Sequence, residues 1–115
     1  MLVFDNQGHR GQSKVVEINP LTQEVVWEFA DSPTTPFYSE TCGTGQRLEN
    51  GNTLITESDN GRVLEVTAGG QVVWEFRNPM RTGPDRQYIA AIMEMVALPA
   101  GARLEWLTDQ NQRVE

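Results

Sequence analysis

The sequence predicts an all-β repeat protein. Three observations support this fold class: a five-residue string that occurs twice, further matches at a similar spacing, and turn residues between runs of β-forming residues. The string Val-Val-Trp-Glu-Phe ends at Phe29 and again at Phe76. Matching positions lie 47, 52 and 50 residues apart, namely Phe29 and Phe76, Leu2 and Leu54, and Leu48 and Leu98. A period of about 50 residues is typical of a four-stranded β-propeller blade, so we expect about two four-stranded antiparallel blades plus part of a third.

The repeats divide the chain into successive blades within a single domain, residues 1–115. Residues 1–29 hold the last three strands of a first blade, expected at 2–5, 14–19 and 24–29. Residues 41–77 form a full blade with strands at 43–48, 53–57, 62–67 and 71–77. Residues 91–107 begin the next blade with strands at 92–98 and 103–107. Tight turns are expected at Asn50-Gly51, Asp59-Asn60-Gly61 and Gly69-Gly70, because Asn, Asp and Gly favour turn conformations.

The two repeated tryptophans, Trp27 and Trp74, predict how the blades pack. Large side chains at equal places in a repeat usually fill the space between neighbouring units. Phe29 and Phe76 lie two residues further on and are expected on the same face as the tryptophans.

A ring cannot close with this number of blades. Propellers need about four to eight blades, so the ring is incomplete unless the chain oligomerises or belongs to a longer propeller. Three copies with two blades each would make six, and a trimer is therefore the favoured homo-oligomer.

Composition excludes several classes of function. The net charge is −7 with no basic stripe, so neither nucleic acid nor an anionic membrane is expected as a partner. The single cysteine, Cys42, excludes an intrachain disulfide and a cysteine-based zinc site. No metal and no cofactor are expected. The N-terminus has no basic segment followed by a long apolar run, so no signal peptide is expected, and the compartment stays open.

Several strings resemble those of arylsulfotransferase-like propeller proteins, which belong with the quinoprotein-like propeller repeats. They include Leu-Val-Phe-Asp-Asn at 2–6, Leu-Glu-Asn-Gly-Asn-Thr-Leu-Ile-Thr-Glu-Ser at 48–58 and the two Val-Trp-Glu-Phe strings. The resemblance implies a six-bladed propeller, exported or periplasmic relatives, and sulfuryl transfer from a phenolic sulfate to a phenol through a nucleophilic histidine. By register, the family's inner-strand histidine and asparagine positions are occupied here by Thr41 and Gly43, and by Ala91 and Met93 in the next repeat.

Candidate site residues lie in loops and near strand ends. His9 is the candidate catalytic base or nucleophile and Arg10 the candidate anion clamp, with a solvated hairpin tip as the alternative. Candidate ligand-binding residues, for a small anionic or aromatic ligand, are Asn6, Cys42, Arg47 and Arg62. For the two arginines, surface ion pairs are the alternative interpretation, and for Cys42 it is a small buried residue.

Two functions follow from these observations. The first is a ligand-binding or assembly scaffold that closes a ring by oligomerisation. The alternative is an aryl sulfotransferase whose channel is built from several chains, with His9 repeated around the axis. Whether the chain is an enzyme is left open by the sequence.

Overall fold

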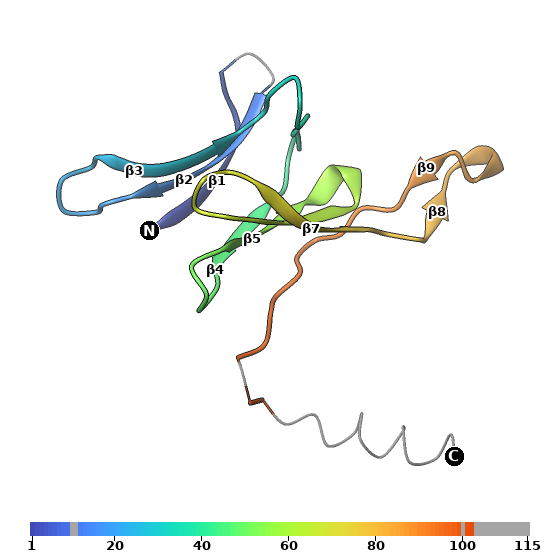
Figure 1. The fold of residues 1–115 in the computed structure, drawn as a ribbon. Coiled ribbons are helices and arrows are strands. Elements are labelled where there is room, and N and C mark those ends of the chain that lie inside the picture. The colour runs from blue at the N-terminus through green and yellow to red at the C-terminus, as the bar shows by residue number, and fades with distance from the viewer. Residues whose placement is uncertain (10–11, 100, 103–115) are drawn as a thin grey trace.

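The protein consists of antiparallel β-sheets, as the computed structural model shows for residues 1–9, 12–99 and 101–102 (Figure 1). The first sheet has three strands in the order β1 (Leu2–His9), β2 (Gln12–Ile18) and β3 (Val25–Ala30). The second has four, in the order β4 (Thr44–Arg47), β5 (Thr53–Glu57), β6 (Arg62–Val66) and β7 (Val72–Arg77). A short hairpin follows, made of β8 (Arg81–Thr82) and β9 (Tyr88–Ile89). The predicted all-β class is confirmed.

Turn chemistry sets the hairpins. The β6–β7 turn closes with a hydrogen bond from Gly70 N to Thr67 O of 2.9 Å, and Gly70 takes a positive φ of 85°. The β2–β3 turn is one residue longer and closes with Gln23 N donating to Asn19 O at 2.7 Å, with Gln23 at φ 62°. A 3-10 turn, η1 (Ser58–Asn60), joins β5 to β6 in the second sheet. Another, η2 (Pro84–Arg86), joins β8 to β9 in the short hairpin.

The two sheets repeat each other in register as well as in sequence. Glu17 lies opposite Trp27 across β2 and β3, and Glu65 lies opposite Trp74 across β6 and β7. Both strand pairs have a register shift directly after that glutamate. Because opposed residues of antiparallel strands share a face, each sheet carries its tryptophan, glutamate and phenylalanine on one side.

The hydrophobic core lies between the two sheets. It contains Val15 and Phe29 from the first sheet and Ile55, Leu64 and Val66 from the second. Phe37, from the connection between the sheets, completes this core, and its ring centroid lies 5.4 Å from that of Phe4 and 5.3 Å from that of Phe29. At Gly45 of β4 a Cβ would lie 3.0 Å from Leu2 Cδ2, so the absence of a side chain there lets the second sheet approach the first closely.

The repeated tryptophans differ in their environment. Trp27 packs against the core, and its Nε1 donates across the gap between the sheets to Ala68 O at 2.9 Å. The prediction that this residue fills the space between two blades is confirmed. Trp74 is 44% exposed on the side of the second sheet that faces away from the first, and it stacks on Phe76 at a centroid distance of 6.3 Å. No described sheet packs on that side, so for Trp74 the expected packing between blades stays a prediction.

The segment after β9 forms no regular strand. Residues 92–98 were expected as a strand, but the structure assigns neither strand nor helix to 91–99. The segment instead runs along the second sheet, where Ser58 Oγ donates to Met93 O at 3.1 Å and Gln46 Nε2 donates to Ala97 O at 3.1 Å. The partner strand expected at 103–107 lies outside the described residues, so the interpretation of 91–107 as the start of a next blade stays a prediction.

Candidate functional site

Arg62, a predicted anion-binding residue, is buried in an ion pair. Its guanidinium donates to both oxygens of the Glu57 carboxylate, from Nε to Oε1 at 2.9 Å and from Nη2 to Oε2 at 2.8 Å. Glu57 is 1% exposed and Arg62 is 8% exposed. The alternative of a surface ion pair was therefore wrong about burial, because the connection between the sheets covers this pair.

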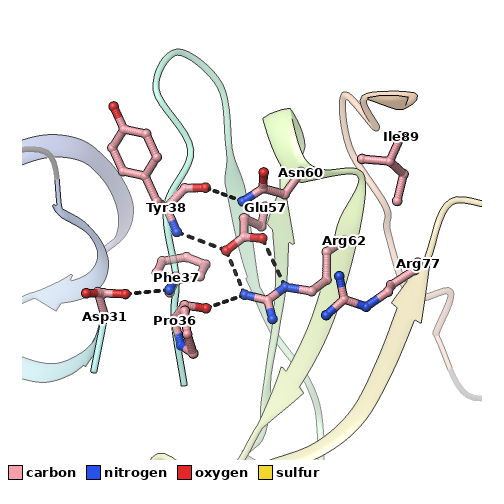
Figure 2. A pocket seen from close by; sticks show the side chains of 9 residues that line it. All are labelled: Asp31, Pro36, Phe37, Tyr38, Glu57, Asn60, Arg62, Arg77 and Ile89. Carbon is pink, nitrogen blue, oxygen red and sulfur yellow. Dashed lines mark hydrogen bonds and ion pairs between the residues drawn. The ribbon is translucent and has the colours of Figure 1, made fainter. Parts of the chain in front are cut away.

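The Glu57–Arg62 pair holds that connection in place (Figure 2). Arg62 Nη2 also donates to Pro36 O at 2.5 Å, and Glu57 Oε2 accepts a hydrogen bond from Tyr38 N at 3.0 Å. These two bonds fall on either side of Phe37, the aromatic ring at the centre of the core. The ion pair and the core residue thus fix the same short stretch of chain.

A pocket of about 460 Å³ opens beside this pair, lined by Asp31, Pro36, Phe37, Tyr38, Glu57, Asn60, Arg62, Arg77 and Ile89 (Figure 2). Its charges are mixed, with Glu57 paired to Arg62, Asp31 on the far side of Phe37 and Arg77 on the next strand (Figure 2). Arg77 Nε lies 2.7 Å from Glu75 Oε1, and Asp31 Oδ1 accepts a hydrogen bond from Phe37 N at 2.6 Å. Arg62 is therefore engaged with a carboxylate and a backbone carbonyl, an arrangement suited to fixing the chain, whereas Arg77 pairs with Glu75 on its own strand and is 61% exposed.

Asn6 and Cys42 lie together, because the Asn6 side chain binds backbone carbonyls of the connection between the sheets. Asn6 Nδ2 donates to Ser39 O at 2.8 Å and to Cys42 O at 3.0 Å. The Cys42 thiol is free and half-buried, and its Sγ lies 3.7 Å from Thr41 Oγ1. Next to them Gly43 has no room for a side chain, because a Cβ there would lie 2.5 Å from the Phe4 ring.

Arg47 lies at the opposite end of the second sheet from Arg62. It pairs in register with Thr53, whereas Arg62 pairs with Glu57 at the other end of β5. Arg47 Nη2 lies 2.7 Å from Glu17 Oε2, and its guanidinium carbon lies 4.9 Å from the centroid of the Trp27 ring. This arginine thus joins the two sheets at their rim, and the structure does not bring the two arginines into one site.

The candidate catalytic pair falls at the edge of what the structure describes. His9 is the last residue of β1 and pairs with Gln12, while Arg10 lies outside the described residues. Among the described residues no group of three or more His, Cys, Asp or Glu side chains is placed to hold a metal ion. Within the same part of the chain no helix is long and apolar enough to cross a membrane.

The second sheet has one side that faces away from the first sheet and on which no described sheet packs, which we call the open face. By register it carries Leu54, Val63, Glu65, Trp74 and Phe76. Part of it is covered by the segment 95–97, and a pocket of about 280 Å³ remains between Leu54, Trp74 and that segment. In the first copy of the repeated string Trp27 and Phe29 pack in the core between the sheets, whereas in the second copy Trp74 is 44% exposed.

The ion pair between Glu57 and Arg62 was not predicted from the sequence. The two residues flank the short turn Ser58–Gly61, so a hairpin there places them opposite each other. The sequence does not indicate that residues 36–38 cover this pair and bury it.

Comparison with known proteins places these sheets in a family. The family model described as arylsulfotransferase (ASST) matches residues 1–79, which hold both sheets and the connection between them. No curated protein and no solved structure gives a significant match. Because the matched region covers more than half of the chain and ends just beyond β7, the repeated sheets described above are those of the family's propeller-like architecture, and the chain belongs to the arylsulfotransferase family.

Proposed function

We propose that this chain is an assembly scaffold, a pair of propeller blades that takes part in a larger ring by presenting its open face to another blade. The observation that carries this proposal is the difference between the two tryptophans. Trp27 is packed against a neighbouring sheet, whereas Trp74, in the same string and the same register, is 44% exposed. An exposed apolar blade face of this kind is normally covered in repeat proteins.

Sulfuryl transfer by this chain alone is disfavoured by its residues. The family resemblance calls for histidine and asparagine at the start of inner strands, and these positions hold Thr41 and Gly43 in one repeat and Ala91 and Met93 in the next. His9 is the only histidine of the chain. Arg47, Arg62 and Arg77 are engaged in the ion pairs described above.

The decisive measurement is the mass of the protein in solution, by light scattering on a sizing column over a range of concentrations. A discrete trimer, with two blades from each chain, is the expected result, and a dimer or tetramer would give four or eight blades and also support assembly. A monomer at all concentrations would overturn the proposal.

The rival function is tested on the assembled protein with a chromogenic aryl sulfate and a phenol acceptor. We expect no turnover above the buffer, and the same baseline for His9→Ala. Turnover that disappears in His9→Ala would establish the sulfotransferase instead.

A further inference from the structure

The contact between the two sheets is a template for a contact between copies. The first sheet presents Leu2, Phe4, Trp27 and Phe29 on its covered face, and the second sheet presents Leu54, Thr56, Trp74 and Phe76 at the matching positions of its open face. What covers Trp27 in the first sheet is therefore a guide to what fits Trp74 in the second.

The complementary surface is the outer face of the first sheet. The side of the second sheet that covers the first carries Ile55 and Leu64, with Glu57 opposite Arg62 at the strand ends. At the matching positions the outer face of the first sheet carries Val3 and Val16, the latter 6% exposed, with Asp5 opposite Lys14, whose Nζ lies 3.8 Å from Glu28 Oε2. The apolar residues and the acidic and basic residue types thus recur at the same register positions.

The connections that follow the two sheets also match, at a spacing of 51 residues. Asn6 Nδ2 binds Cys42 O, and Ser58 Oγ, at the matching position of the second sheet, binds Met93 O. Counted from these two hydrogen bonds, Tyr88 corresponds to Phe37, one residue away from the spacing of 50 that relates Leu48 to Leu98. Phe37 is 1% exposed between the two sheets, whereas Tyr88 is 58% exposed.

We propose that a second copy of this chain docks head to tail on the open face, with the outer face of its own first sheet. In this interface the Trp74 indole donates to Pro20 O of the second copy, because Pro20 takes the place of Ala68, the acceptor of Trp27. Tyr88 packs against Val3 and Val16 of the second copy, as Phe37 packs against Ile55 and Leu64. Lys14 and Asp5 of the second copy bind the backbone of residues 87–89, as Arg62 and Glu57 bind that of residues 36–38.

This inference rests on the proposed assembly function and names the partner and its surface. The head-to-tail arrangement uses two different faces, so it extends from copy to copy and closes into a ring when the rotation fits. The competing occupant of the open face is the chain's own segment 103–115, and the experiment below separates the two.

The test is photo-crosslinking with p-benzoylphenylalanine in place of Trp74. We expect a product that joins two chains, with the second attachment in the turn that contains Pro20 and Leu21, identified by mass spectrometry on mixed isotope-labelled and unlabelled protein. The matched control carries the same residue in place of Trp27 and should attach within one chain to the turn at Ala68. Attachment of position 74 to residues 103–115 of its own chain, or to position 74 of another chain, would overturn the inference.

A second variant tests the acid–base pair. Lys14→Met should weaken association about tenfold, the loss expected for one charge-assisted hydrogen bond, while Lys14→Arg should retain it. The thermal unfolding of the dissociated chain should be similar in the two variants. If the protein assembles but the cross-links lie elsewhere, only the docking geometry fails; if it stays monomeric throughout, the assembly function fails with it.

Discussion

Replacement of Arg62 by methionine tests the role of the buried ion pair. Arg62→Met leaves Glu57, which is 1% exposed, without its cation, and leaves Pro36 O without its donor. A buried charge that loses its partner costs about 3–5 kcal/mol of unfolding free energy. The loss should be large here because the same pair fixes the chain on both sides of Phe37.

The matched control is Arg47→Met. Arg47 is also paired with a glutamate, at 2.7 Å, but both side chains are about one-third exposed, at 32% and 34%. Solvent screens such a pair, so the expected loss is at most about 1 kcal/mol, with an added contribution from contact with Trp27 of similar size.

Urea unfolding, followed by circular dichroism, measures both variants. It should be done at equal, low protein concentration, since association adds to the apparent stability. The reasoning is refuted if the m-values are unchanged and Arg62→Met lowers the free energy of unfolding by no more than Arg47→Met does. The double variant Glu57→Gln/Arg62→Met should lose less than the sum of its single changes, because each single change leaves its partner unpaired.

Three other changes give further predictions. Gly61→Ala should destabilise by more than about 2 kcal/mol, because Gly61 has φ 55° and a Cβ would lie 2.3 Å from Ala90 O, whereas Gly51→Ala, with φ 89° and nothing within 4 Å, bears only the backbone strain. Phe37→Ala should cost about 3–5 kcal/mol in urea unfolding, and a loss below 1 kcal/mol would contradict its place in the core. Thr53→Val should raise the unfolding free energy by about 1 kcal/mol, because the buried Thr53 hydroxyl has no hydrogen-bond partner among the described residues; a loss of stability would show that the hydroxyl is satisfied.

The sequence repeat was sufficient to locate the strands of both sheets. The seven expected strands of 1–77 all occur, because alternating β-formers and Asn, Asp and Gly turns act locally. The bounds differ mainly at β1, which extends to His9 instead of ending near Asp5. The β8–β9 hairpin was not predicted, since its strands have only two residues each and depend on η2 between them.

The candidate site was less predictable, for a physical reason. Repeats indicate which residues are equivalent but not which neighbours surround them, so Trp27 and Trp74 carried the same expectation and have different environments. The burial of Arg62 similarly depends on Pro36, a residue 26 positions earlier in the chain. Contacts of this range follow from the docking of one sheet on another, which no local pattern records.

The proposed interface between copies should be weaker than the interface between the two sheets within the chain. Within the chain Arg47 connects Glu17 to the Trp27 ring, so one cation serves a carboxylate and an aromatic face together. In the next repeat the glutamate and tryptophan are retained as Glu65 and Trp74, but the residue 50 positions after Arg47 is Ala97. In the proposed contact between copies this cation would have no counterpart, and the contact would consist of apolar packing, the indole hydrogen bond and the bonds from Lys14 and Asp5 to residues 87–89. A weaker contact between copies than within the chain would let each pair of blades fold as a unit before the units associate.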